Sequence, residues 1–448
     1  MATTDLDRFD VVVVGAGSAG AVLATRLSEH PGRRVLLLEA GPDHRSVDTP
    51  ASIAGGSFLS AVREPGRVWP SLEAVRTAGQ APRPYLRGRG VGGSSAVNAM
   101  LALPGEPGDY DRWGVEGWAW ADVAPWFERT ALSLREVRAD EVGPLGAALL
   151  QADPAAERMT LTRSADGRRA SVNDCYLEPA RHRPNLMIRG DALVDRVLLQ
   201  GRRAIGVRLA DGTEIEAAHV IVSSGAIHSP AILLRSGLAL PGIGDGLQEH
   251  PSFPITLQLR PDVQRPAAGL GATALLRATF AEHHDLQVLA LEEAEPTMPE
   301  LAVLLGALMQ VHSTGAVRLR SDDPTVDPVV DFAMLSDERD VPGMRAAVDL
   351  VERIAASPAV AEIAHVLPYD ASDAGVRAAL GDYVHATGTC RMGVVVDGRC
   401  AVVGHEGLTV CDASVMPYVP RANTHLPTVM IAERVAAMLS ASLSASAS

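Results

Sequence analysis

The stretch VVVVGAGSAGAVLATRLSEHPGRRVLLLEAG, residues 11–41, decides the fold of this 448-residue chain. Residues 11–14 are consecutive valines, which favour a strand buried on both faces. Residues 19–29 have the pattern of a helix, and residues 35–38 have that of a second buried strand. Strand, glycine-rich turn, helix and strand in this order predict a βαβ unit within a parallel sheet.

The turn GAGSAG (15–20) matches the pattern G-x-G-x-x-G, which dinucleotide-binding units place between a strand and a helix. Gly15 permits the tight turn, Gly17 lets the backbone approach a pyrophosphate, and Gly20 lets helix and strand pack closely. The helix that follows Ser18 offers free N–H groups and the positive end of its dipole to phosphates. We therefore expect a bound dinucleotide.

Segments far from this turn favour FAD over NAD as that dinucleotide. Glu39 ends the second strand and Ala40 follows it, at a place where a carboxylate can accept hydrogen bonds from ribose hydroxyls. Residues 87–98, RGRGVGGSSAVN, form a second glycine-rich loop, and GLTVCDASVM (407–416) places an aspartate at a strand end. A cofactor engaged by three such distant segments is more readily buried and permanently held than exchanged.

Composition excludes several classes of protein. The formal net charge of −14 disfavours nucleic acid and anionic membrane surfaces as partners. All 40 basic residues are arginine, which excludes pyridoxal phosphate on a Schiff-base lysine and a Walker A lysine. The chain shows no long apolar run, so we expect no membrane span. The first strand begins too early to leave room for a cleaved signal peptide, and a cytoplasmic location is expected.

The spacing of the cysteines and histidines limits which disulfides and metal sites the chain can form. Cys175, Cys390, Cys400 and Cys411 show no C-x-x-C spacing, so reduced thiols are expected, although a disulfide between two of the last three stays open. No H-x-x-x-H spacing is present, and we therefore predict no metal site.

The whole chain predicts a two-domain protein of the α/β plus α+β class. A Rossmann-like FAD-binding domain comprises residues 1–250 and 395–440, with cap segments at about 41–86 and 105–185. Residues 251–394, with short strands and many prolines, predict a substrate domain built on an antiparallel sheet with helices. Helices are expected at 113–136, 337–356 and 427–440, and the low-complexity tail 441–448 predicts disorder.

Six segments together resemble the glucose–methanol–choline (GMC) oxidoreductase family, and the chain resembles a short bacterial member of it. They are RGRGVGGSSAVNAMLALPGEPGDYDRW (87–113), SSGAIHSPAILLRSGL (223–238), LQEHP (247–251), HATGTCRMG (385–393), DASVMP (412–417) and NTHLPTVMIAE (423–433). Ala239 stands where the second family signature has glycine, and the deficit in length falls within residues 251–384. The resemblance covers most of the chain and implies a FAD-dependent oxidoreductase that acts on alcohols.

The resemblance also assigns site residues by position. His385, in H-x-x-G-T-x-x-M-G, matches the catalytic histidine, and His425 matches a second active-site position that is His or Asn in the family. Val97 stands where some relatives attach the flavin through a histidine, which implies non-covalent FAD. The expected cofactor contacts are Gly15, Gly17, Ser18, Gly20, Glu39, Ala40, Arg89, Gly92, Gly93, Ser94, Asn98, Val194, Asp412, Ala413 and His425.

Oxidation of an alcohol by a flavin requires a base for the hydroxyl proton and an acceptor for the hydride. A neutral imidazole suits the first task. We expect His385 to take the proton and His425 to stabilise the developing alkoxide, although the sequence leaves the two roles exchangeable. The other histidines are expected to be structural or exposed, with His250 in a loop and His283 and His284 forming a solvated pair.

Three other functions stay open at this point: a flavin-containing lyase of the same family, an NAD-dependent dehydrogenase, and a binding protein without catalysis. The substrate is open as well, because the apolar stretch PELAVLLGALMQV (299–311) suits an aliphatic or aryl alcohol as readily as a sugar. The electron acceptor is oxygen, a quinone or another redox cofactor, and the short chain favours a dehydrogenase.

Overall fold

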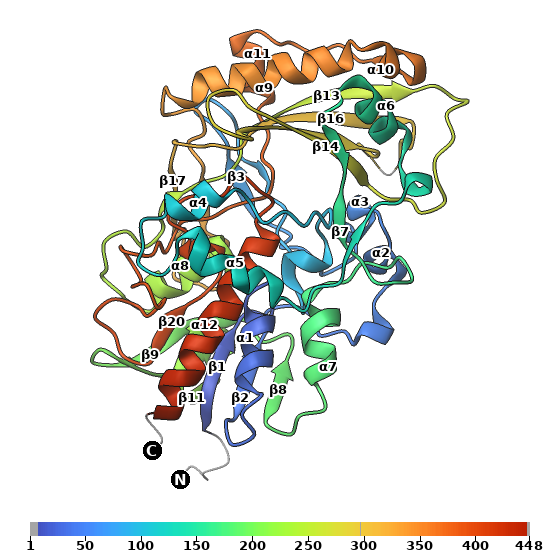
Figure 1. Cartoon of the computed structure of the whole chain (residues 1–448). Helices are drawn as coiled ribbons and strands as arrows, with labels where there is room; N and C mark the ends of the chain where they lie inside the picture. The colour runs from blue at the N-terminus through green and yellow to red at the C-terminus, as the bar shows by residue number, and fades with distance from the viewer. Residues whose placement is uncertain (1–7, 296, 446–448) are drawn as a thin grey trace.

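The structure is a computed structural model that describes residues 8–295 and 297–445. A seven-stranded sheet with its helices occupies the end of the molecule at which both termini lie (Figure 1). A six-stranded antiparallel sheet occupies the opposite end. This arrangement agrees with the predicted pair of a Rossmann-like domain and a substrate domain.

The seven-stranded sheet is built on the predicted βαβ unit. β1 (Phe9–Val14) pairs in parallel with β2 (Val35–Leu38) on one side and with β11 (Glu214–Val222) on the other. The remaining strands are β8 (Leu186–Arg189) beyond β2, β20 (Leu408–Val410) beside β11, and the antiparallel pair β10 (Arg203–Leu209) and β9 (Val194–Gln200). The valines of β1 and all of β2 are buried, as expected of central strands covered on both faces.

Helices from both ends of the chain cover this sheet. α1 (Gly20–Leu27) follows the glycine turn and packs against α12 (His425–Ala445), while α8 (Gly225–Arg235) follows β11. Arg26 Nε lies 2.8 Å from Glu433 Oε2, and the carboxylate is almost completely buried. This ion pair joins the C-terminal helix to the N-terminal βαβ unit.

Helix α12 corrects one expectation and bears on a second. Residues 441–445, expected to be disordered, continue the helix, whereas 446–448 lie outside the described residues. By length and composition alone, the segment 425–444 could cross a membrane, although 61% of its most apolar window lies buried inside the protein. A core helix meets the same criterion, so the absence of a membrane span stays a prediction.

The second large sheet is antiparallel throughout. Its order is β19 (Ala364–Val366), β13 (Ser252–Leu259), β16 (Leu301–Leu308), β15 (Leu286–Leu291), β14 (Ala272–Ala278) and β6 (Ala156–Arg158). The helices at this end are α6 (Pro144–Ala152), α9 (Asp340–Ala355), α10 (Pro358–Ile363) and α11 (Asp373–Ala379), of which α9 and α6 pack on the sheet (Figure 1). The edge strand β6 comes from the segment that the sequence assigns to a cap of the first domain.

Smaller elements join the two ends of the molecule. A mixed sheet contains β12 (Asp245–Leu247), β17 (Gly315–Arg318), β18 (Val329–Asp331), β3 (Glu73–Val75) and β4 (Arg83–Pro84), and β5 (Leu134–Glu136) pairs with β7 (Thr160–Thr162). Short helices are α2 (Ala51–Ala54), α3 (Phe58–Val62) and α7 (Glu178–Ala180). The mixed sheet combines strands from both sides of residue 250. The domain boundaries proposed from the sequence stay a prediction.

The single long helix expected at 113–136 is wrong. α4 (Pro107–Asp111) and α5 (Trp120–Glu128) are separate helices, and β5 follows them. Gly114 has a φ of +64° and Gly117 a φ of +78°, a left-handed conformation that ends helices. The tryptophans pack into the body of the fold: Trp118 is fully buried, and its Nε1 donates to the carbonyl oxygen of Gly398 at 2.8 Å.

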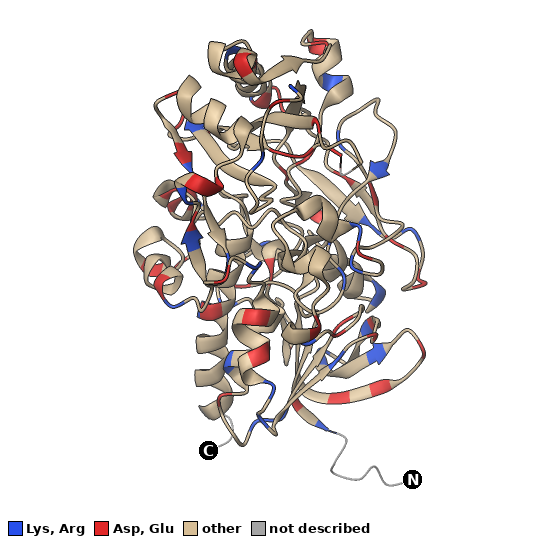
Figure 2. Ribbon diagram, turned by 90° about the vertical axis from the view of Figure 1, so that its right-hand side faces the viewer, with Lys and Arg blue, Asp and Glu red and all other residues tan. Residues whose placement is uncertain are grey.

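Charges and thiols agree with an ordinary globular surface and interior. Acidic and basic positions are interspersed over the length of the molecule in the view of Figure 2. All four cysteines, each within the described residues, are free, so the disulfide that the sequence leaves open is not formed. Burial raises the pKa of the Cys390, Cys400 and Cys411 thiols.

His219 makes the parallel sheet sensitive to acid. Its Nε2 lies 2.9 Å from Thr409 Oγ1 of β20, and burial lowers the pKa of His219 to about 4. Below pH 6.5 the unfolded chain binds a proton that the folded chain binds only near pH 4, so stability falls as the pH drops through this window. We expect wild-type protein to lose about 1 kcal/mol more than His219→Gln between pH 6.5 and 5.5, measured by denaturant unfolding. Equal losses would contradict this assignment.

Candidate active site

One cavity of about 420 Å³ extends from the glycine turn after β1 to the antiparallel sheet of the substrate domain. Its wall combines distant parts of the chain, from Val14 at the end of β1 to Thr428 in α12. The cavity opens at the carboxyl ends of β1, β2 and β11, where doubly wound sheets bind nucleotides. Its volume is typical of sites that bury a small molecule.

Two glycine-rich loops meet on the cavity wall with no side chain between them. A Cβ atom on Gly93 would lie 2.6 Å from the Cα atom of Gly17, and Gly93 has a φ of +51°. A Cβ atom on Gly15, which has a φ of +99°, would lie 2.5 Å from the carbonyl oxygen of Ser223. A side chain at Gly93 would therefore separate the loops, and one at Gly15 would collide with the backbone that follows β11. Their backbone is free to approach a ligand closely, as a pyrophosphate requires.

Glu39, which the sequence assigns to ribose binding, also ties the two loops together. Its Oε2 accepts a hydrogen bond from the N–H of Ala16 at 2.8 Å, and its Oε1 accepts from Gly90 at 2.8 Å and from Gly41 at 3.0 Å. The carboxylate is buried and still lines the cavity. Each carboxylate oxygen has two lone pairs, so Oε2 keeps one for a ribose hydroxyl.

Most of the predicted cofactor contacts lie on the cavity wall. They are Gly15, Gly17, Ser18, Glu39, Ala40, Gly93, Ser94, Asn98, Val194, Asp412, Ala413 and His425. Three others lie behind the wall. Gly20 packs against the backbone of Gly15, Gly92 donates its N–H to the carbonyl oxygen of Ala16 at 2.9 Å, and Arg89 Nη2 donates to that of Ala40 at 2.7 Å. Gly20, Gly92 and Arg89 shape the loops without reaching the cavity, and the other contacts stay predictions.

His385 lies on the cavity wall with three polar neighbours. Its backbone N–H donates to Glu249 Oε2 at 2.6 Å, its Nδ1 lies 2.9 Å from His250 Nδ1, and its Nε2 lies 3.2 Å from Asn423 Nδ2. Burial, followed by the nearby charges of His250 and Arg87, lowers the pKa of His385 well below its ordinary value. The imidazole is therefore neutral over the ordinary pH range, and its orientation is fixed from both sides.

A buried network supports the backbone behind His385. Glu249 Oε2 also accepts from Tyr85 Oη at 2.7 Å, and its Oε1 accepts from the N–H of His250 at 2.9 Å. Burial and the charge of Asp382 raise the pKa of Glu249 to about 8, while burial lowers the pKa of His250 to about 3. Because three donors converge on one carboxyl group, Glu249 fastens the His250 and His385 segments to each other.

His425 begins α12 and faces the first glycine loop. Its Nδ1 lies 2.9 Å from Ser18 Oγ, and its Nε2 has no hydrogen-bond partner among the described residues. Burial, followed by the charge of Arg169, lowers the pKa of His425 to about 4. The structure thus brings both predicted histidines to one cavity, but the side chain beside His385 Nε2 is that of Asn423.

Buried polar atoms without partners show where a ligand fits. Besides His425 Nε2, they include Asn423 Oδ1 and Tyr383 Oη, all from residues of the cavity wall. A buried polar group without a partner costs about 1–3 kcal/mol, so a bound molecule that supplies partners is favoured. Loops open to phosphates, a spare lone pair at Glu39 and neutral imidazoles in the same cavity fit a flavin dinucleotide.

The sequence missed the partners of His385. His250 is expected from the sequence to be a structural loop residue, but it forms a hydrogen bond with the predicted catalytic histidine. Glu249 and Asn423 are not predicted at all. All three lie in LQEHP (247–251) or NTHLPTVMIAE (423–433), two segments that the resemblance already selects. The signal that could have identified these three residues is their polar character within segments that the family resemblance selects.

Comparison with known proteins identifies the family. Family models described as GMC oxidoreductase match residues 9–159, 153–252 and 311–432. The 5-(hydroxymethyl)furfural oxidase of Methylovorus sp. (strain MP688) is 32% identical over 96% of this chain and 98% of that protein. The mitochondrial choline dehydrogenase of Mus musculus is 33% identical over 97% of this chain and 90% of that protein. The first alignment extends over 532 positions, more than the 448 residues here, so this chain lacks segments that the relative has.

Solved structures show the same fold. The crystal structure of pyridoxine 4-oxidase from Mesorbium loti has a TM-score of 0.87 and 26% identity, and covers 96% of this chain and 99% of that chain. A formate oxidase from Aspergillus oryzae RIB40, at 20% identity, has a TM-score of 0.87 over 98% of this chain and 99% of that chain. The chain therefore belongs to the GMC oxidoreductase family and is a FAD-dependent oxidoreductase that acts on CH–OH groups.

Proposed function

We propose that this enzyme oxidises uncharged, largely apolar primary alcohols to aldehydes, with non-covalently bound FAD and with His385 as the proton acceptor. The observation that supports the role of His385 most strongly is the 2.9 Å separation between its Nδ1 and the Nδ1 of His250. Once the tautomer of His250 is assigned, this contact sets which nitrogen of His385 carries a proton, and therefore which one can receive another.

Only one of the two facing nitrogens can donate in this hydrogen bond. The other nitrogen of His250, Nε2, is buried without a hydrogen-bond partner among the described residues, and we assign the ring proton to it. His250 Nδ1 then accepts, and His385 donates through its own Nδ1. His385 Nε2 consequently carries the lone pair at the cavity wall, where it accepts a hydrogen bond from Asn423 Nδ2 at 3.2 Å. An alcohol hydroxyl would take the place of this donor. His250 acts here as a positioning residue.

This arrangement assigns a task to each polar group of the wall. His385 Nε2 takes the hydroxyl proton of an alcohol that lies within about 2.6–3.2 Å. Asn423 Nδ2 and His425 Nε2 are available to donate hydrogen bonds to the oxygen as it gains alkoxide character. FAD, when bound, supplies a hydride acceptor at N5 of its ring. Because the pKa of His385 is lowered, its imidazole is already neutral and can accept the hydroxyl proton directly.

Non-covalent attachment of FAD is supported by the residues of the wall. Val97 is buried and lines the cavity at the position where the resemblance places a histidyl linkage. Its isopropyl group cannot bond to a flavin, and no cysteine stands among the residues that line the cavity. Acid precipitation of the holoenzyme is therefore expected to release all FAD into the supernatant.

The substrate side of the cavity is mainly apolar. It is lined by Met100, Leu101, Leu289, Leu291, Leu305, Tyr383 and Val384. The carboxylates of the wall are engaged: Asp382 pairs with Arg76 at 2.6 Å, and Asp412 Oδ2 accepts from Ser229 Oγ, also at 2.6 Å. Glu39 belongs to the loops at the other side. A cationic alcohol such as choline would therefore find no unengaged carboxylate among the described wall residues, whereas an aryl alcohol such as 5-(hydroxymethyl)furfural would meet apolar surface.

Anaerobic flavin reduction tests this function. Holoenzyme is mixed without oxygen with benzyl alcohol, 1-hexanol, choline or glucose, and the flavin absorbance is followed by stopped flow. We expect the first two alcohols to bleach the flavin at least tenfold faster than the others. An oxidised spectrum that persists with every alcohol would contradict the proposal. Readmission of oxygen, or addition of a quinone, then identifies the acceptor.

We also propose a cytoplasmic location, supported by the free cysteines.

A further inference from the structure

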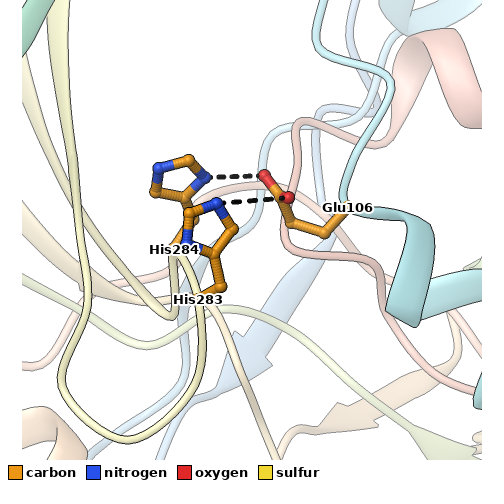
Figure 3. Close-up of side chains that lie close together, drawn as sticks. All are labelled: Glu106, His283 and His284. Carbon is orange, nitrogen blue, oxygen red and sulfur yellow. Dashed lines mark hydrogen bonds and ion pairs between the residues drawn. The ribbon is translucent and has the colours of Figure 1, made fainter.

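Glu106, His283 and His284 converge at a site outside the wall of the FAD cavity (Figure 3). Glu106 Oε1 lies 2.7 Å from His284 Nδ1, and Glu106 Oε2 lies 3.8 Å from His283 Nε2. One possible ligand atom from each of the three residues lies within 4.8 Å of the others. The two imidazoles belong to the turn between β14 and β15, and the carboxylate precedes α4, 178 positions from His284.

We propose that these three side chains bind a divalent transition metal ion such as Zn²⁺. Imidazole nitrogen and carboxylate oxygen are the donor atoms that such ions take from proteins. Bonds of about 2.0–2.1 Å in a tetrahedral site separate neighbouring donor atoms by about 3.3 Å. The two measured separations, 2.7 and 3.8 Å, lie on either side of that value, so small rotations of the side chains create the site. The fourth position is left for water.

The backbone of the turn holds the two histidine side chains next to each other. His284 has a φ of +55°, a left-handed conformation that is uncommon outside glycine. The rings of the two adjacent histidines lie side by side as a result, with centroids 3.7 Å apart. Asp285 closes the turn, because its carboxylate accepts the N–H groups of Phe280, Ala281 and Glu282 at 2.7 to 2.8 Å. Little reorganisation is needed to bring both imidazoles to one ion.

The charges around the site permit an ion to enter. Arg277 Nη1 lies 3.3 Å from Glu106 Oε1, but the same guanidinium pairs with Glu157 at 2.8 Å and keeps that partner if an ion displaces it from Glu106. The His283 side chain is 68% exposed, so an ion reaches Nε2 directly from solvent. The exposed carboxylate of Glu282, which precedes His283, lies 3.6 Å from Arg421 Nη1 and so compensates the positive charge of that arginine beside the turn.

The site also connects to the loop that supports the catalytic base. Arg421 Nη1 donates to the carbonyl oxygen of His283 at 2.6 Å, and Arg421 Nε pairs with Asp109 Oδ1 at 2.7 Å. Asn423, the neighbour of His385 Nε2, lies two residues further along the chain. An ion that fastens the turn to Glu106 therefore stabilises the support of Asn423. The proposed ion is structural and takes no part in proton or hydride transfer.

Zinc titration of the FAD-loaded enzyme tests the site. After removal of metals with a chelator, calorimetry with ZnCl₂ is expected to show one ion bound per chain. The midpoint of thermal unfolding should rise with zinc concentration, because the ion binds only the folded state. Since loss of outer-shell partners alone costs 10–100-fold in affinity, His283→Ala and Glu106→Gln are each expected to weaken zinc binding at least about 100-fold. His365→Ala, an exposed histidine of β19, should bind zinc like wild type.

Two outcomes would overturn the proposal: no saturable zinc binding by the wild-type enzyme, or undiminished binding by both His283→Ala and Glu106→Gln. His283 is largely exposed, so its replacement is not expected to disturb folding. The flavin content of each variant shows whether the fold is intact. A second readout uses Cu²⁺ with electron paramagnetic resonance. Nitrogen couplings from two imidazoles are expected in wild type and from one imidazole in His283→Ala. Identical spectra for the two proteins would place the ion elsewhere.

Discussion

His385→Ala lowers the rate constant of anaerobic flavin reduction by about 10²–10⁴-fold, the range expected when a positioned general base is removed. The wild-type base is neutral because burial lowers its pKa, and its Nε2 lone pair is directed by the hydrogen bond from Nδ1 to His250. The methyl group of alanine can neither take a proton nor hydrogen-bond Asn423. Stopped-flow reduction with a saturating primary alcohol measures the effect.

The flavin stays bound in this variant, because the glycine loops and Glu39 are untouched. Two comparisons complete the experiment. Free imidazole in the buffer should restore part of the rate in His385→Ala, since the lost group is a base. His405→Ala, which removes a half-buried histidine that does not line the cavity, should reduce its flavin at the wild-type rate. A loss of less than about threefold in His385→Ala would show that another group takes the proton.

Gly93→Ala abolishes stable FAD binding, so the protein purifies nearly colourless. A Cβ atom at this position would lie 2.6 Å from the Cα atom of Gly17. That atom belongs to the backbone, which cannot rotate away. The left-handed φ of +51° adds about 1–2 kcal/mol of strain. Separation of the two loops removes the surface that a pyrophosphate approaches. The ratio of flavin to protein absorbance after purification measures the loss.

Gly201→Ala separates steric contact from backbone strain. Gly201 has a similar φ of +60°, but a Cβ atom there would meet nothing within 4 Å. We expect this variant to be slightly less stable than wild type and to retain its full complement of FAD. If Gly93→Ala also retained full FAD, the close approach of the two loops would not be needed for cofactor binding.

The sequence could predict what depends on local pattern. The four valines of β1, the glycine spacing at 15–20 and the aspartate–glycine turn between β10 and β11 each specify their structure within about ten residues. The same holds for Gly17, Gly93 and Glu39, which short motifs mark. Both histidines that were predicted from their motifs line the cavity.

Features that depend on contacts between distant segments escaped prediction. No spacing rule connects His250 with His385, which are 135 positions apart, or Glu106 with the 283–284 pair. The helix expected at 113–136 failed for a different reason: helical composition outweighed two glycines whose left-handed backbone interrupts it. Helix α12 runs past residue 440, where Leu443 is partly buried against the hydrophobic core, in a segment whose composition alone indicates disorder.

A crystal structure of the FAD-bound enzyme with an unreactive analogue of a primary alcohol, such as a fluorinated alcohol, tests the central claim most directly. We predict that the hydroxyl oxygen lies about 2.6–3.2 Å from His385 Nε2, with Nδ1 of the same ring still bonded to His250. A hydroxyl group bound to His425 alone, with the His385 ring turned away from the flavin, would contradict the account.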